Sequence, residues 1–277
     1  MTGPSPRIPI ALSIAGSDSS GGAGIQADLK TFSAFGVYGA TVLTALTAQN
    51  TRGVQAVHLV PPEFVAKQIA SVLDDLDVAA AKTGMLANAE IIDSVAAALA
   101  GRRRLDLVVD PVMVATSGDV LLEPAAIAAL RDRLFPIARL ITPNLPEAAK
   151  LLDEPMARNE TEARGQLERL GRLGAAAVLL KGGHGAGAEA VDLLLADGEI
   201  TRLASPRIAT GNTHGTGCTL SAAICALLAE GVPLRDAVAR AKTYVYGAIL
   251  AAQGRRIGGG AGPVDHHFAM RGGRPPA

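Results

Sequence analysis

The stretch NTHGTGCTLSAAICALLAEG, residues 212–231, places a cysteine where a glycine-rich segment meets an apolar run. Gly215 and Gly217 permit a tight turn, which would leave the backbone amides of Gly215, Thr216, Gly217 and Cys218 free at the start of a helix. Free amides and the positive end of the helix dipole together bind anions. The stretch therefore predicts an anion site.

Cys218 is the residue in this stretch whose side chain could do chemistry. The helix dipole favours a thiolate, so we expect Cys218 to lose its proton readily and to act as a base or a nucleophile. The alternative is that Cys218 is simply a small residue that fits the turn. Cys225 lies further along the same helix among apolar residues, and we expect it to belong to the core.

The two cysteines also bear on the compartment. Along a helix they would lie roughly 10 Å apart, which a disulfide cannot span. Two thiols without a cluster of histidines do not make a zinc site, so we expect a reducing environment and a cytoplasmic protein. The formal net charge of zero and the absence of a long apolar stretch favour a small-molecule partner over nucleic acid or a membrane.

Short apolar runs alternate with stretches of helical spacing along most of the chain. The runs cover residues 8–16, 39–46, 77–84, 105–112, 138–144 and 176–183. This alternation predicts an α/β fold with a mostly parallel sheet, formed as a single domain over residues 1–277. Two further apolar runs joined through Asp197 and Gly198 predict an appended hairpin. We expect apolar helices at about 217–230 and 234–252, and a loosely ordered tail from about 254 to 277 in which His266 and His267 are surface residues.

Polar residues follow most of the predicted strands at the point where each strand ends. They are Asp18, Lys82, Asp110, Asn144 and Lys181. Because ligands bind beyond the carboxyl ends of parallel strands, we expect these side chains to meet at one edge of the sheet.

A second glycine-rich segment, AGSDSSGGAGIQAD at residues 15–28, competes for the role of phosphate loop. Its Gly22, Gly24 and Ala27 have the spacing of a dinucleotide-binding turn, but no acidic residue lies between Asp28 and Glu63 to hold a ribose. The chain also lacks a P-loop motif, so a nucleoside triphosphate would have to use the anion site at residues 215–218.

Two carboxylates and one ammonium group could manage the charge of a triphosphate. Asp110 and Glu147 follow neighbouring predicted strands, and oxygen ligands suit Mg²⁺. Glu147 could instead complement the dipole of a helix, and Lys181 could simply be solvated.

Seven segments in order carry a family resemblance: AGSDSSGGAGIQADLKTFSAFGVYG, TALTAQNT, GMLAN, DPVMVATSGD, LITPNLPEAAKLL, LKGGHG and NTHGTGCTLSAAI. From about Ile10 to Gly262 the chain resembles the hydroxymethylpyrimidine/phosphomethylpyrimidine kinases of thiamine biosynthesis, in the ribokinase-like superfamily. The resemblance implies a three-layer α/β/α sandwich, a homodimer, and two phosphorylations that consume ATP and require Mg²⁺. The 5-hydroxymethyl group of 4-amino-5-hydroxymethyl-2-methylpyrimidine would be phosphorylated first, and the monophosphate would then become the diphosphate.

The resemblance also implies residue roles. Gln49 would read the pyrimidine, and its amide suits that role because it offers a donor and an acceptor side by side. Cys218 falls where most ribokinase-like enzymes use an aspartate base. The other implied positions are Asp28, Gly16, Met85 and Val112 at the substrate, Gly215, Thr216 and Gly217 at the transferred phosphoryl group, Lys181, Asn144 and His214 at the nucleotide phosphates, and Asp110 and Glu147 at the metal. Gly211 departs from the pattern, because many relatives carry a basic residue there.

Two other functions compete with this one. A pyridoxal or pyridoxine kinase acts on a similar hydroxymethyl-bearing ring, although Gln49 and Met85 in their motifs favour the pyrimidine. A non-catalytic sensor of pyrimidine phosphates would be expected to lose the base or the glycines of the anion site. The presence of Cys218, Gly215 and Gly217 therefore favours an enzyme.

Overall fold

The computed structural model describes residues 8–102, 104–115, 118–119, 121–123, 125–183 and 187–271. Its centre is an eight-stranded sheet of order β10-β9-β8-β7-β6-β5-β1-β2. The strands are β1 (Ile10–Ala15), β2 (Tyr38–Leu43), β5 (Ala80–Thr83), β6 (Asp106–Val109), β7 (Leu140–Ile141), β8 (Ala177–Leu180), β9 (Glu189–Ala196) and β10 (Glu199–Pro206). Six neighbouring strands of this sheet run parallel: β2, β1, β5, β6, β7 and β8. Beyond β8, strand β9 pairs antiparallel with β8, and β10 pairs antiparallel with β9.

The central strands are short apolar runs because both of their faces are buried. All four residues of β5 and all four of β8 are buried, as expected for a parallel sheet covered by helices on both sides. The appended hairpin is confirmed: Asp197 and Gly198 join β9 to β10 with φ values of 52° and 76°. Both are positive, as the tight hairpin turns that match strand twist require.

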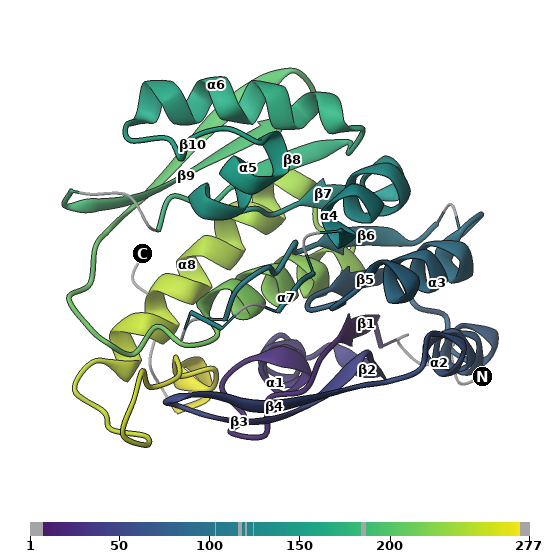
Figure 1. Cartoon of the computed structure of the whole chain (residues 1–277). Helices are drawn as coiled ribbons and strands as arrows, with labels where there is room; N and C mark the ends of the chain where they lie inside the picture. The colour runs from purple at the N-terminus through teal and green to yellow at the C-terminus, as the bar shows by residue number, and fades with distance from the viewer. Residues whose placement is uncertain are drawn as a thin grey trace, which may run out of the picture.

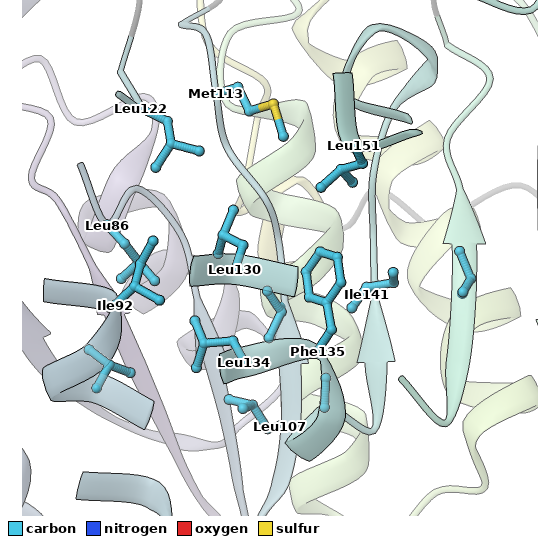
Figure 2. Packing of buried hydrophobic residues seen from close by; sticks show 14 of the residues in the cluster. Leu86, Ile92, Leu107, Met113, Leu122, Leu130, Leu134, Phe135, Ile141 and Leu151 are labelled. Carbon is cyan, nitrogen blue, oxygen red and sulfur yellow. The ribbon is translucent and has the colours of Figure 1, made fainter. Parts of the chain in front are cut away.

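Helices cover both faces of the sheet (Figure 1). One layer holds α1 (Gly24–Ala34), α7 (Thr216–Ala229) and α8 (Leu234–Ala252), and the other holds α2 (Pro62–Asp75), α3 (Ala89–Leu99), α4 (Ala126–Ala129), α5 (Leu145–Leu152) and α6 (Glu160–Leu170). Short π and 3-10 segments add η1 (Leu130–Leu134), η2 (Phe135–Ile137), η3 (Gly171–Leu173) and η4 (Phe268–Arg271). Figure 2 shows leucine, isoleucine and Phe135 side chains filling the space between the sheet and the second layer. The three-layer sandwich is confirmed.

The apolar run at residues 39–46 does not form one strand. The chain leaves the central sheet at Thr44, whose hydroxyl donates to the carbonyl of Met85 at 2.6 Å. A separate two-stranded sheet follows, made of β3 (Ala45–Asn50) and β4 (Gly53–Leu59). The prediction of a single strand was wrong because the run reads as continuously apolar although its two halves belong to different sheets.

In the segment after α8, which the sequence suggested to be a loose tail, the part around residues 264–268 packs against the rest of the protein. Val264, His266 and Phe268 are buried, and the Tyr244 hydroxyl donates to the carbonyl of His266 at 2.5 Å. His266 is therefore not a surface residue, whereas His267 is half-buried. Residues 272–277, the end of the predicted tail, lie outside the described part of the chain. Within that part, no helix has the length and apolar character needed to cross a membrane.

Candidate active site

A cavity of about 660 Å³ opens at the carboxyl ends of the parallel strands. It lies where the strand order reverses, since β1 sits between β2 and β5, and such a switch point is the usual ligand site of an open parallel sheet. Of the polar residues predicted at the strand ends, Lys82 does not line this cavity. Of the site positions that the family resemblance implied, all except Asp28 line it. They are Gly16, Gln49, Met85, Asp110, Val112, Asn144, Glu147, Lys181, His214, Gly215, Thr216, Gly217 and Cys218.

The anion site is present at the start of α7. Gly215 precedes the helix with φ of 79°, the left-handed conformation that glycine allows. Within the described residues, the amides of Gly215, Gly217 and Cys218 donate to no protein acceptor. The Thr216 amide is not free, because it donates to the carbonyl of Thr213 at 3.2 Å. The site therefore offers three open amides rather than the four that we expected.

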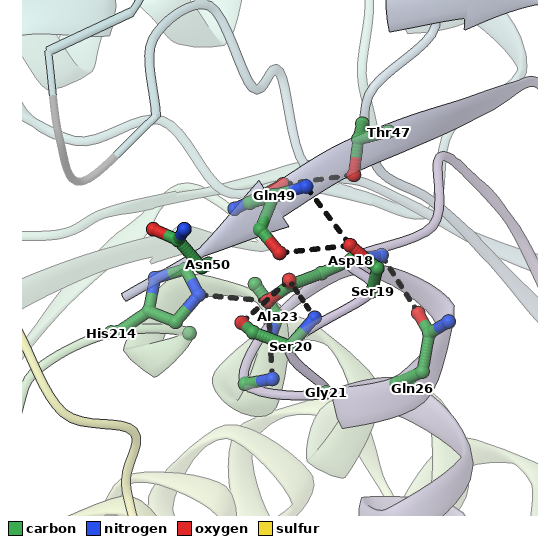
Figure 3. Close-up of polar contacts among 12 residues, drawn as sticks. Asp18, Ser19, Ser20, Gly21, Ala23, Gln26, Thr47, Gln49, Asn50 and His214 are labelled. Atoms are coloured by element: carbon green, nitrogen blue, oxygen red, sulfur yellow. Dashed lines mark hydrogen bonds and ion pairs between the residues drawn. The ribbon is translucent and has the colours of Figure 1, made fainter. Parts of the chain in front are cut away.

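The other glycine-rich loop is not a phosphate site, because its own carboxylate occupies its donors (Figure 3). Asp18 accepts from the amides of Ser20, Gly22 and Ala23 at 2.9, 3.1 and 2.8 Å, and from the Ser20 hydroxyl at 2.7 Å. Burial alone would raise the pKa of Asp18, but these bonds and one from His214 hold that pKa well below its usual value. These donors are therefore not open to a phosphate.

His214 is held by the same carboxylate. Its Nε2 lies 2.8 Å from Oδ2 of Asp18, and both side chains are nearly inaccessible to solvent. Nε2 of His214 is therefore engaged by Asp18, and only Nδ1 is left for the predicted contact with nucleotide phosphates.

The Cys218 thiol does not have the lowered pKa that its position predicted. Burial raises its pKa to about 11, and the Lys82 ammonium and the Gly24 amide offset only part of that effect. Desolvation disfavours the charged form of any acid, and the nearby carboxylates of Asp28 and Asp110 act in the same direction. Both cysteines are free thiols, as the spacing predicted.

Asp28 lies behind the cavity wall instead of facing the substrate. It is fully buried, accepts from the Ser13 hydroxyl at 2.6 Å, and lies 3.0 Å from Nζ of Lys82 through each of its oxygens. Burial opposes the charge on Lys82, but Asp28 more than compensates and raises the pKa of Lys82 above its usual value. Asp28 therefore fixes a buried cation beneath the site. The sequence signal was Lys82 itself, a lysine directly in an apolar strand, which must find a counter-ion.

Asp110, Lys181 and Glu147 form the charged end of the cavity. Nζ of Lys181 lies 2.8 Å from Oδ1 of Asp110 and 3.8 Å from Oε2 of Glu147. Thr142 and Ser221 also donate to Asp110, at 3.1 and 3.2 Å. Despite burial, Lys181 keeps the pKa of Asp110 below its usual value, whereas burial raises the pKa of Glu147 to about 7.

Asn144 and Glu147 also have a structural role. The side chain of Asn144 accepts from the backbone amide of Glu147 at 2.8 Å, and the side chain of Glu147 accepts from the backbone amide of Asn144 at 2.7 Å. These reciprocal bonds form a capping box at the start of α5. The helix-dipole alternative for Glu147 therefore holds alongside its position in the cavity. Sequence alone could not separate the two roles because they coexist.

Another part of the cavity combines apolar side chains, those of Met85 and Val112, with the polar side chains of Gln49 and of the neighbouring Ser17 and Asp18. Gly16 packs so closely on Met85 that an added Cβ would lie 3.2 Å from its sulfur. Oε1 of Gln49 lies 3.2 Å from the hydroxyl oxygen of Thr47, and the Gln49 side chain is half-buried (Figure 3). Val112 completes the wall. A flat ring with polar edges suits this part of the cavity, and an anionic chain suits its charged end.

The fold and this site define a small-molecule kinase of the ribokinase-like class, in which open amides at a helix start adjoin an acceptor pocket. Residues 18–265 match the family model for phosphomethylpyrimidine kinase. A hydroxymethylpyrimidine/phosphomethylpyrimidine kinase of Rhizobium meliloti is 58% identical over 261 residues, which cover 94% of this chain and 97% of that protein. The chain belongs to the phosphomethylpyrimidine kinase family and is a phosphotransferase.

Solved structures agree with the fold. A phosphomethylpyrimidine kinase of Clostridium difficile superposes with a TM-score of 0.77 at 44% identity, covering 88% of this chain and 100% of that chain. A pyridoxal kinase of Bacillus subtilis, solved as an ADP complex, gives a TM-score of 0.87 at 38% identity, covering 96% of this chain and 99% of that chain.

Proposed function

We propose that the protein transfers the γ-phosphoryl group of ATP to 4-amino-5-hydroxymethyl-2-methylpyrimidine and then to the resulting monophosphate, in thiamine biosynthesis. The observation that carries this proposal is the group of three open amides, at Gly215, Gly217 and Cys218, beside an apolar pocket that contains Gln49. Phosphoryl transfer needs mainly positioning and charge stabilisation, and amides at a helix start provide both.

The substrate would lie with its ring between Met85 and Val112 and its polar edge toward Gln49. The ring nitrogen and the exocyclic amine present an acceptor next to a donor, which matches the amide of Gln49. The hydroxymethyl group would then point toward Cys218. Because the pKa of Cys218 is about 11, the thiolate is the minor form near pH 7. We propose that this minor form takes the hydroxyl proton as the new P–O bond forms.

The residues present fit a magnesium ion shared with the nucleotide. Asp110 and Glu147 supply carboxylate oxygens on both sides of Lys181. The described residues contain no group of three or more His, Cys, Asp or Glu that could hold a metal by themselves. Mg²⁺ usually binds through one or two carboxylates, with phosphate oxygens and water as its other ligands. When bound, the ion would neutralise charge on the triphosphate, while Lys181 and the open amides orient the phosphates.

A pyridoxal kinase is the second candidate, because a pyridoxal kinase shares the whole fold at a TM-score of 0.87. The higher identity to the pyrimidine kinase, 58% against 38%, favours the pyrimidine. The presence of the open amides and of Cys218 argues against a non-catalytic sensor.

Release of ADP from ATP and Mg²⁺ should be measured with each acceptor: the hydroxymethylpyrimidine, its monophosphate and pyridoxal. We expect turnover with both pyrimidines and a kcat/KM for pyridoxal at least about tenfold lower, the discrimination that a lost polar contact provides. A preference for pyridoxal would make the pyridoxal kinase the better assignment, and no ADP release with any acceptor would revive the sensor.

We also propose a homodimer in the cytoplasm. Leu46 is 48% exposed on one face of the β3–β4 sheet, and Val57 and Leu59 are 43% and 36% exposed on its other face, so both faces offer apolar side chains to a second copy of the chain. Two free thiols suit a reducing compartment. Light scattering would show twice the chain mass if the dimer forms, and Leu46→Lys would reduce it to the monomer.

A further inference from the structure

Two glycine-rich loops meet beside the active site, and one buried pair of side chains joins them. The first loop, residues 16–24, follows β1, and the second, residues 212–217, precedes α7. Nε2 of His214 lies 2.8 Å from Oδ2 of Asp18, and the two side chains are 8% and 1% exposed. Figure 3 shows His214 reaching across to the cluster around Asp18.

The loops touch so closely at this pair that only glycine fits. A Cβ on Gly22 would overlap the His214 ring, and a Cβ on Gly215 would overlap the carbonyl of Gly22. Gly22 itself has no positive φ, so its lack of a side chain serves the contact with the ring and not the backbone conformation. Gly22 therefore serves the packing between the two loops.

The hydrogen bond between Asp18 and His214 has a defined direction. Asp18 is ionised, because bonds from His214, Ser20 and Ala23 hold its pKa far below its usual value. An ionised carboxylate only accepts, so Nε2 of His214 carries the proton in the neutral and in the charged ring. Such charge-assisted bonds are short and strong, and this one fixes the ring orientation. His214 directly precedes Gly215, which carries the first open amide.

The same first loop also holds the strand that carries Gln49. The Ser19 hydroxyl donates to the backbone carbonyl of Gln49 at 2.8 Å and accepts from the backbone amide of Gln49 at 2.9 Å. The Thr47 hydroxyl donates to the carbonyl of Ser17 at 2.8 Å. Residues 17–23 thus contact both the acceptor pocket and the anion site.

We propose that the Asp18–His214 pair is a positioning clasp, which aligns the open amides of Gly215, Gly217 and Cys218 with the acceptor held next to Gln49. His214 is then a positioning residue, and the contact with nucleotide phosphates expected from the resemblance is not its main role. The inference rests on the proposed function, because it assigns the clasp to phosphoryl transfer. Misplacement of a reacting group by about 1 Å lowers the rate on the order of 100-fold, so a bond that fixes the position of these amides would contribute to the rate of transfer.

The test compares three variants with the wild type in the ADP-release assay. His214→Leu removes the bond, Gly22→Ala displaces the ring from the other side, and His214→Gln keeps a donor near the position of Nε2. We expect the first two to lower kcat by about 10- to 100-fold with each KM changed by less than about threefold, since only alignment is lost. His214→Gln should recover most of kcat. His58→Leu, at an exposed histidine of β4, is the matched control.

Hydrogen exchange of the substrate-free protein supplies a readout that does not depend on activity. We expect the amides of residues 212–218 to exchange faster in His214→Leu than in the wild type, and His214→Gln to match the wild type. Unchanged exchange in His214→Leu would overturn the clasp, as would a tenfold rise in the KM for ATP with kcat retained. If the wild type fails to phosphorylate the pyrimidine, the proposed function fails, and the exchange data still decide whether the clasp exists.

Discussion

At the scale of single residues, burial and the charged partner of each group decide the ionisation of Cys218 and Lys82. Cys218 lies at the start of α7, yet desolvation raises its pKa to about 11. Lys82, which is fully buried, stays charged because both oxygens of Asp28 lie 3.0 Å from its Nζ. The two groups differ in their partners, because Lys82 contacts the carboxylate of Asp28, whereas the Cys218 thiol has only the nearby Lys82 ammonium and the Gly24 amide to stabilise its charged form.

This difference predicts the pH dependence of catalysis. Below a pKa of about 11 the thiolate fraction of Cys218 rises tenfold per pH unit, so the single-turnover rate should rise between pH 7 and pH 10. Cys218→Ala should lower that rate by about two to four powers of ten, the usual effect of a positioned proton acceptor, with the pyrimidine still bound. Rapid-quench measurements provide the check. An unaltered rate in the variant would leave Cys218 as a residue that merely fits the turn.

Gln49 gives a second prediction at this scale. Gln49→Leu should raise the dissociation constant of the pyrimidine by about 10- to 100-fold, because the polar edge of the ring would lose its partners. Calorimetric titration of the pyrimidine measures this effect, and the midpoint of thermal unfolding serves as the control for the fold. An unchanged dissociation constant would remove Gln49 from the acceptor pocket.

At the scale of elements, helix starts are used in two ways. The start of α7 keeps amides open, whereas α5 closes its first turn with the reciprocal bonds of Asn144 and Glu147. A similar cap occurs at α6, where the Asn159 side chain accepts from the Glu162 amide at 2.9 Å on an exposed surface. The α6 cap provides a matched control for the α5 cap.

Asn144→Ala and Asn159→Ala should each lower the free energy of unfolding by about 1 kcal/mol, the usual cost of a lost cap. Only Asn144→Ala should also raise the KM for ATP, because loss of the Asn144 side chain removes one bond that holds Glu147 in place beside Lys181. Chemical denaturation and initial rates measure the two effects. Equal KM values in both variants would show that the α5 cap has no link to the nucleotide.

The sequence predicted the elements more fully than the contacts among them. Alternating apolar runs predicted the parallel sheet, the β9–β10 hairpin, and helices α7 and α8 almost residue for residue. The separate β3–β4 sheet was missed, because nothing in an apolar run marks where it changes sheets. The role of Asp18 was also missed, since a carboxylate that satisfies its own loop looks in sequence like any strand-end acid.

At the scale of the whole molecule, the segment after α8 closes the structure over the layer of α1, α7 and α8. The rings of Phe268 and Tyr244 lie 5.4 Å apart. Nε2 of His266 lies 3.1 Å from the hydroxyl of Thr219, which is in α7. Its glycine-rich start explains why the sequence suggested a loose tail, whereas Val264, His266 and Phe268 are alternately buried and pack against the protein.

His266 makes the stability of this closure depend on pH. Burial lowers its pKa from 6.5 to about 4, so between these values the unfolded chain binds a proton that the folded chain does not. Stability should therefore fall as the pH falls from about 6.5 to about 4, by up to about 3.5 kcal/mol from this residue at about 1.4 kcal/mol per pKa unit.

His266→Gln should flatten this part of the curve of unfolding free energy against pH, and His267→Gln should not. Urea denaturation at half-unit pH steps measures both. Parallel curves for wild type and His266→Gln would contradict the assignment of the acid sensitivity to His266.

The central claim is that the open amides at the start of α7 hold the phosphoryl group in transfer. The most direct test is a crystal structure of the protein with ADP, Mg²⁺, aluminium fluoride and the hydroxymethylpyrimidine. The account predicts that fluorine atoms accept from the amides of Gly215, Gly217 and Cys218, with the acceptor oxygen next to the sulfur of Cys218. Aluminium fluoride bound at residues 18–24, or away from α7, would contradict it.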